Sequence, residues 1–291
     1  MSSFFPLFRQ SRRAYRWHIL KKRDFPVAES FLREREKNCV SACAGFIRPG
    51  KADCVWFIPD EAGNIISLLI YNRSSLFPVL GENRDIPAPR FLGRFLNLIP
   101  IHSVQGITHD TEVFESFLDR IGRKPGSRID YDLLYTDQEP QAGILPNSPP
   151  GLLLRPVDVT DIEALFPLQA AYEREEVLPP DTVFNPASCR LTLERIVSRE
   201  YVLAACLGSR IVGKANTNAE SFTRYQIGGV YVHTDCRGLG IATLMTATLV
   251  RELIARGKGV SLFVKKRNVA ARAVYRRIGF VSAGEYRITY Y

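Results

Sequence analysis

The sequence predicts a mixed α/β protein with a central twisted β-sheet flanked by helices, built as a tandem of two related folds. Three observations support this prediction. Strand-like apolar segments alternate with segments whose apolar residues recur at helical spacing. The second half contains a strand, a glycine-rich turn, a helix and another strand in direct succession. The first half repeats much of this order of elements but has no glycine-rich turn.

In the first half, the spacing of apolar residues predicts a helix over residues 26–44. Residues 54–71 are expected to form a strand, a turn and a second strand, and residues 102–109 a further strand. Residues 111–122 have a helical period, and residues 128–137 have the composition of a strand. The order helix, hairpin, strand, helix, strand is therefore the same as in the second half.

In the second half, short apolar runs predict strands, and a Gly-Ser turn at Gly208 predicts that two of them form a hairpin. The predicted strands cover residues 152–157, 200–208, 210–219, 225–232, 259–264 and 280–291. Longer amphipathic segments predict helices, several of which end before a glycine. The predicted helices cover residues 160–174, 187–199, 240–256 and 268–277.

A linker is predicted between the halves. Residues 136–151 hold four prolines and two glycines and have no sustained apolar period. We therefore expect an N-terminal domain over residues 1–140, a Pro/Gly linker over 141–151 and a C-terminal domain over 152–291.

The net charge of +9 is concentrated in two basic runs that contain no acid, residues 9–23 and 256–277. Such runs suit a polyanionic partner, namely a phosphorylated cofactor, nucleic acid or an acidic membrane surface, although a solvated basic face explains them as well. The six cysteines are scattered and form no CxxC pair, so neither a disulfide framework nor a metal site is predicted. No segment is long and apolar enough for a membrane helix, and we expect a cytoplasmic protein.

The stretch "VYVHTDCRGLGIATLM", residues 230–245, joins a strand to a helix through a turn with two glycines. Glycine permits positive φ and close approach of a ligand, and the first N–H groups of a helix lack internal partners. The turn therefore suits a phosphate or pyrophosphate, while a plain strand-to-helix turn is the alternative.

Three phosphate motifs compete for this turn. A P-loop is excluded because no lysine is followed by serine or threonine. A dinucleotide fingerprint is disfavoured because Thr243 takes its third glycine position and no acid lies about 20 residues further on. A turn of the form Arg/Gln-x-x-Gly-x-Gly/Ala fits at every fixed position of residues 237–242.

With its neighbouring segments, this turn resembles the GNAT N-acetyltransferase superfamily. "GGVYVHTDCRGLGIATLM" is similar to the family's fourth strand, pyrophosphate turn and following helix. "VSLFVKKRNVAARAVYRRIGF" is similar to its fifth strand and next helix, with the family's Asn at Asn268 and its Tyr at Tyr275. The resemblance covers about residues 152–291. It implies tandem GNAT-like domains, of which the first is a degenerate or accessory copy.

The resemblance implies that acetyl-CoA (coenzyme A) is the cofactor, and that its acetyl group passes to an amine by direct attack in a ternary complex. In the family the glycine turn holds the pyrophosphate and the preceding strand binds the pantetheine arm. The cofactor-binding residues expected on this basis are Val230, Val232, Arg237, Gly238, Leu239, Gly240, Ile241, Ala242, Thr243 and Asn268. Tyr275 is the expected catalytic residue, the general acid that protonates the departing thiolate.

The general base is left open, because the strand over 224–232 carries no Asp or Glu. The candidates are Glu173, Glu175, Glu176 and Glu220. The acceptor is a small-molecule or peptide amine of unspecified identity, and the sequence does not fix the oligomeric state. The alternative is a non-catalytic acyl-CoA sensor or a basic nucleic-acid-associated module. The nucleic-acid version is disfavoured because no RNA-binding motif or zinc finger is present.

Overall fold

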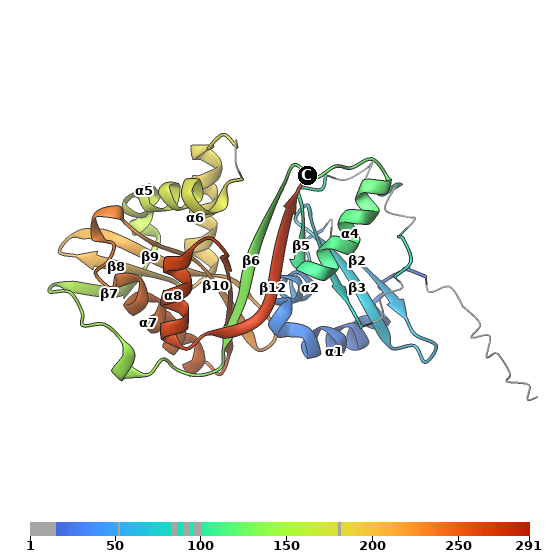
Figure 1. Ribbon diagram of the computed structural model, residues 1–291, viewed down its shortest axis with the longest axis horizontal. Helices are drawn as coiled ribbons and strands as arrows, with labels where there is room; N and C mark the ends of the chain where they lie inside the picture. Colours follow the sequence, from blue (N-terminus) through green and yellow to red (C-terminus); the bar gives the residue numbers. More distant parts are fainter. Residues whose placement is uncertain (1–15, 52, 83–85, 90–93, 96–99, 180–181) are drawn as a thin grey trace, which may run out of the picture.

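The computed structural model describes residues 16–51, 53–82, 86–89, 94–95, 100–179 and 182–291 (Figure 1). Residues 9–15 of the first basic run lie outside these ranges. The strands are β1 His18–Ile19, β2 Cys54–Pro59, β3 Ile65–Asn72, β4 Ser75–Leu80, β5 Ser103–Ile107, β6 Ser127–Thr136, β7 Leu152–Pro156, β8 Val202–Leu207, β9 Arg210–Glu220, β10 Arg224–Val232, β11 Gly259–Lys265 and β12 Val281–Tyr290. The α-helices are α1 Phe25–Arg35, α2 Val40–Ile47, α4 Thr108–Arg120, α5 Ile162–Tyr172, α6 Pro186–Arg199, α7 Ile241–Ala255 and α8 Val269–Ile278.

The described strands form one mixed sheet in the order β1-β2-β3-β4-β5-β12-β6-β11-β10-β9-β8-β7. Strand β6 of the first half pairs with β11 of the second, and β12 of the second half pairs with β5 of the first. Strands β6 and β12 also pair with each other, antiparallel, at the centre of the molecule (Figure 1). The two halves thus exchange their last strands, and each half completes its part of the sheet with a strand of the other half.

Helices cover both faces of the second half of the sheet. Successive residues of β8 alternate between two cores, as period-2 side-chain direction requires. Leu203 and Ala205 pack under α7 and α8, whereas Ala204 and Cys206 pack under α5 and α6. The predicted α/β class and the tandem order of elements are confirmed.

In the first half, the predicted helix over 26–44 is two helices, α1 and α2, separated by a 3-10 turn at Glu36–Asn38. The break turns the Glu36 carboxylate toward the second half of the chain. There it accepts hydrogen bonds from the Ser221 hydroxyl and from the backbone N–H and hydroxyl of Thr223. Periodicity alone does not reveal such a break, because the two helices bury their apolar residues in one core.

Strand β4 was not predicted from the sequence. It contains Pro78, which lacks an N–H and argues against a strand inside a sheet. The strand is parallel to β5 and is paired with it at Ser75–Leu76 and Ser103–Val104. Pro78 therefore lies beyond the residues of β4 that pair with β5.

Candidate functional site

The glycine turn has the backbone that the sequence predicts. After β10, a 3-10 turn at Thr234–Cys236 leads to Gly238 and Gly240, whose φ angles are +80° and +76°. Gly240 is the N-cap of α7 and provides no side-chain cap. The first N–H groups of α7 therefore have no intrahelical acceptor and carry the positive end of the helix dipole.

The linker closes one side of this turn. A Cβ placed on Gly240 would lie 2.7 Å from Cγ of Pro146. The Arg277 guanidinium donates to the carbonyl of Ile144 at 2.9 Å, and Leu145 packs against the core of the second half. Glycine is therefore required at position 240 for two reasons, namely its positive φ and the close approach of the linker.

A groove of about 720 Å³ runs from this turn along α8. Every predicted site residue lines it except Leu239, whose side chain is half exposed to solvent. Arg267 and Arg277 line it as well and add positive charge. The groove thus combines free helix N–H groups with cationic side chains, which suits a phosphorylated ligand such as coenzyme A.

Arg237 has partners that the sequence did not predict. Its guanidinium donates to the carbonyl of Val232 at 3.1 Å and to the Glu175 carboxylate at 2.8 Å. It also lies over the ring of Tyr231, 5.2 Å from the ring centroid. The hydrogen bond to Glu175 raises the pKa of Arg237. Arg237 therefore ties the glycine turn to the segment after α5.

A β-bulge lies in β10 at Gly228 and Gly229, where the register with β9 shifts and Gly229 has a φ of +61°. The Gly229 N–H donates to the Tyr172 hydroxyl at 3.3 Å, and its carbonyl accepts from Lys214 Nζ at 3.1 Å. A Cβ on Gly229 would lie 2.0 Å from Oδ1 of Asn216. The absence of side chains at the two glycines therefore allows polar side chains to approach and contact the bulge.

Lys214 is fully buried, and its Nζ also donates to Oδ1 of Asn216 at 2.9 Å. Its ammonium group lies 5.0 Å from the centroid of the Tyr172 ring. Burial lowers the pKa of Lys214 to about 7. No pattern in the sequence singled out this lysine, because a single lysine inside a strand resembles an edge or surface residue.

Strands β10 and β11 separate after their first residues. Arg224–Gln226 of β10 pair with Gly259–Ser261 of β11. On its other side, β11 pairs with β6 from Val260 to Lys265. A second cavity, of about 330 Å³, lies at this separation. It receives Tyr131 from β6 and Ile288 and Tyr290 from β12, so both halves build it.

The two cavities share lining residues. Both are lined by the apolar residues Val230 and Ala271. Both are also lined by three polar residues, Glu176, Asn268 and Tyr275. The groove along the glycine turn and the cavity between the halves therefore adjoin at these residues.

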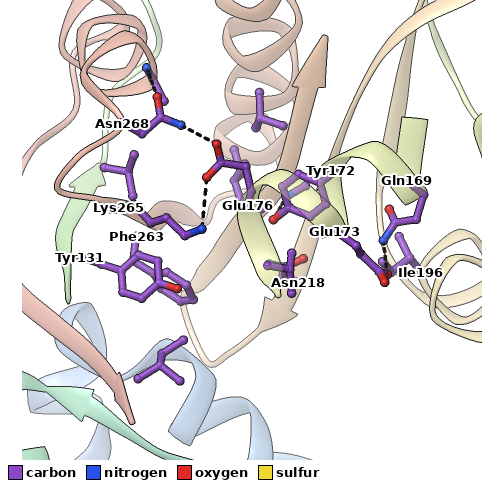
Figure 2. A pocket seen from close by; sticks show the side chains of 18 of the residues that line it. Tyr131, Gln169, Tyr172, Glu173, Glu176, Ile196, Asn218, Phe263, Lys265 and Asn268 are labelled. Atoms are coloured by element: carbon purple, nitrogen blue, oxygen red, sulfur yellow. Dashed lines mark hydrogen bonds and ion pairs between the residues drawn. The ribbon is translucent and has the colours of Figure 1, made fainter. Parts of the chain in front are cut away.

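Glu176 lies in a π-helical extension of α5 over Glu173–Val177. One carboxylate oxygen accepts from Asn268 Nδ2 at 3.1 Å, and the other lies 3.6 Å from Lys265 Nζ (Figure 2). Glu173, one turn earlier, accepts from Gln169 Nε2 at 2.9 Å and lines the same cavity (Figure 2).

Glu220, the fourth candidate base, lies away from both cavities. Its carboxylate binds Lys258 and Arg48, each at 2.7 Å, and accepts from the Tyr225 hydroxyl at 3.1 Å. These contacts hold the pKa of Glu220 below its usual value although burial opposes them. Glu220 therefore belongs to an ion-pair cluster between the halves.

Tyr275 is buried, in edge-to-face contact with the ring of Phe280 at 5.8 Å between centroids. Burial raises the pKa of Tyr275, so the phenol keeps its proton at neutral pH. Asn268 is the N-cap of α8, accepting from the Ala271 N–H at 3.0 Å while its amide group donates to Glu176. The seven-residue spacing thus places both side chains where the cavities meet.

Several cations of the second basic run form ion pairs. Lys258, Lys266 and Arg272 pair with Glu220, Glu285 and Asp132, respectively. Lys265, in the same run, is buried beside Glu176. Of this run, Arg267 and Arg277 face the groove.

Within the described part of the chain, no helix has the length and apolarity to cross a membrane. The same residues contain no cluster of three or more His, Cys, Asp or Glu side chains that could hold a metal ion.

Comparison with known proteins agrees with this geometry. Residues 163–280 match the acetyltransferase (GNAT) family. No curated protein matches the chain significantly.

Solved structures share the fold over nearly the whole chain. A Drosophila protein is 10% identical with a TM-score of 0.66, covering 96% of this chain and 99% of its own. A tandem GNAT protein from the clavulanic acid biosynthesis pathway is 13% identical with a TM-score of 0.59, covering 94% and 97%. A GNAT-family acetyltransferase from Colwellia psychrerythraea is 12% identical with a TM-score of 0.52, covering 94% and 98%. Both halves thus take part in a tandem fold of this kind.

Proposed function

We propose that the protein is an N-acetyltransferase that moves an acetyl group from acetyl-CoA to an amine, because residues 163–280 match the acetyltransferase (GNAT) family. One observation carries the proposal. The groove beside the glycine turn and the cavity between the halves meet at Glu176, Asn268 and Tyr275. A cofactor in the groove and an acceptor in the cavity would react at this junction.

The residues of the groove fit coenzyme A. The N–H groups of residues 238–243 would bind the pyrophosphate, with the helix dipole adding to the attraction. Arg267 and Arg277 would face the remaining phosphate charge. The unpaired side of β10 beyond Gln226 would bind the pantetheine arm through the backbone of Val230 and Val232. Acetyl-CoA, when bound, supplies an activated thioester.

The side chains at the junction divide the proton transfers. Glu176 takes a proton from the acceptor ammonium group, and the freed amine nitrogen forms a bond to the acetyl carbon. The Val230 N–H, next to the bulge at Gly229, would serve as the oxyanion donor to the thioester carbonyl. Tyr275 would give its proton to the departing thiolate sulfur and would recover one from the nitrogen of the new amide. The net reaction releases one proton.

Binding of acetyl-CoA tests the first part of the proposal. Arg267→Glu reverses a charge in the groove and is expected to weaken acetyl-CoA binding about 10-fold or more in calorimetry. Arg276→Glu is the matched control, because Arg276 is exposed on α8, a few residues after Arg267, and does not line the groove. The control should bind as the wild type does. If both variants and the wild type bind equally, the groove is not the cofactor site.

Turnover tests the second part. We expect release of free coenzyme A from acetyl-CoA when a panel of primary amines is supplied. Tight binding without turnover across the panel would instead identify the non-catalytic acyl-CoA sensor.

A further inference from the structure

The cavity between the halves is small and is lined by side chains from distant parts of the chain. Its volume of about 330 Å³ is at the lower end of the range for sites that hold small molecules. Tyr131 and Tyr290 come from the exchanged strands, and Glu173 and Glu176 come from the π-helical segment. The space suits a compact molecule better than an extended peptide.

Lys265 lines this cavity at the end of β11. Its side chain is only 3% exposed, and its Nζ has no hydrogen-bond acceptor among the described residues. Its nearest acid, Glu176, is 3.6 Å away and already accepts from Asn268. An ammonium group buried without an acceptor is costly, so an acceptor supplied from outside the protein would stabilise it.

The cavity therefore presents opposite charges side by side, with Lys265 Nζ and Glu176 Oε2 separated by 3.6 Å (Figure 2). Glu173 adds a second carboxylate nearby. The cavity's other cation, Arg195, interacts with Glu200. An α-amino acid carries an ammonium group and a carboxylate group on the same α-carbon. This arrangement is complementary to the adjacent carboxylate and ammonium groups of the cavity.

Part of the remaining wall is aromatic and aliphatic. Tyr131 and Phe263 are in edge-to-face contact at 5.0 Å between centroids, and Phe263 stacks on Tyr286 at 4.9 Å. Ile288 and Tyr290 line the same side. This surface would cover an apolar or aromatic substituent.

We infer that the acceptor is a free amino acid with an apolar side chain, whose carboxylate binds Lys265 and whose amino group faces Glu176 and Glu173. This inference rests on the proposed function, since it names the substrate class of the same site. It makes Lys265 a specificity-determining residue, because a simple amine would leave its ammonium group without an acceptor.

Matched pairs of acceptors test the inference. Each pair compares an amino acid with the amine that lacks its carboxylate, namely leucine with 3-methylbutylamine and phenylalanine with phenethylamine. Release of coenzyme A from acetyl-CoA gives kcat/KM for each. The amino acid should be preferred about 10- to 100-fold, the range of a hydrogen bond to a charged group. Equal rates, or faster rates with the simple amines, would overturn the inference and leave the proposed function intact.

Variants identify the residue responsible. Lys265→Met is expected to lose the preference, whereas Lys265→Arg should keep much of it. Lys266→Met is the matched control, because Lys266 is adjacent, pairs with Glu285 and lines neither cavity. Circular dichroism and thermal melting check that each variant is folded. A preference that survives in folded Lys265→Met would show that Lys265 does not bind the carboxylate.

A binding measurement separates failure of the inference from failure of the proposed function. N-acetylphenylalanine keeps the carboxylate but has no reactive amine, and N-phenethylacetamide lacks both. Calorimetry with protein saturated with coenzyme A should show tighter binding of the first compound, lost in Lys265→Met. This result without any turnover would support the carboxylate site and contradict the acetyltransferase. Equal binding of the two compounds would contradict the carboxylate site.

Discussion

The side-chain amide of Asn268 joins two parts of the site that lie 92 residues apart in the sequence. Its oxygen caps α8 by accepting from the Ala271 N–H, and its nitrogen donates to the carboxylate of Glu176 at 3.1 Å. One residue therefore fixes both the start of the helix that carries Tyr275 and the position of the acid that both cavities share.

Glu176→Gln is expected to lower kcat about 100-fold or more, because the amide cannot take the acceptor's proton. Acetyl-CoA affinity should change little. Glu220→Gln is the matched comparison, since Glu220 was also a candidate base in the sequence but lines neither cavity. Steady-state kinetics with a reactive amine distinguish the two. Loss of activity in Glu220→Gln but not in Glu176→Gln would reverse the assignment.

Tyr275→Phe is expected to lower kcat about 100-fold with acetyl-CoA binding retained. Burial raises the pKa of Tyr275, so the wild-type acid should stay protonated beyond about pH 10, the ordinary value for tyrosine. At pH values lower than this, the wild-type rate should therefore show no decrease caused by deprotonation of Tyr275. An unchanged rate and pH profile in Tyr275→Phe would remove the tyrosine from the mechanism.

Lys214 makes stability depend on pH. Its pKa is lowered to about 7 in the folded protein, chiefly by burial, against about 10.4 when unfolded. Between these values the unfolded chain holds the extra proton, so the stability of the folded protein rises with pH. From pH 7.5 to 9.5 the contribution is about 2 kcal/mol.

Lys214→Met should lack this increase, and urea unfolding at both pH values measures the difference. Lys266→Met, at an exposed lysine, should rise as the wild type does. Parallel pH dependence in wild type and Lys214→Met would mean that Lys214 keeps its proton when buried.

Glu36 accepts three hydrogen bonds from the turn between β9 and β10 and is itself buried. Glu36→Ala should lower the free energy of unfolding by about 2–4 kcal/mol, because Ser221 and Thr223 lose a charged acceptor. Glu36→Gln, which keeps an acceptor oxygen, should cost less. Chemical denaturation measures both, and equal losses would argue against the hydrogen bonds as the cause.

The fragment of residues 151–291 lacks β6, which lies between β11 and β12. It should expose the unpaired edges of both strands together with the apolar surface that Tyr131 and Leu133 cover. We expect aggregation in size-exclusion chromatography. A monomeric, active fragment would show that the first half is dispensable for the fold of the second.

Much of the fold could be predicted because its signals are local. In the second half, the predicted elements match the observed ones to within a few residues, from β7 to β12. The misses have identifiable causes. Pro78 argues against a strand at β4, and the continuous helical periodicity gives no sign of the break at Glu36. The glycine turn was predictable because positive φ at Gly238 and Gly240 selects glycine at any such position.

The sequence by itself determined most of the secondary structure, the glycine turn before α7 and the spacing of Asn268 and Tyr275, because these depend on neighbours within one helix or turn. Tertiary structure alone decided that Glu176 rather than Glu220 lies at the junction of the cavities, and that Lys265 and Lys214 are buried. It also decided that β6 pairs with β11 of the second half and that β12 pairs with β5 of the first. Pairing between strands and burial of a charge depend on contacts between residues far apart in the chain, which local patterns do not record.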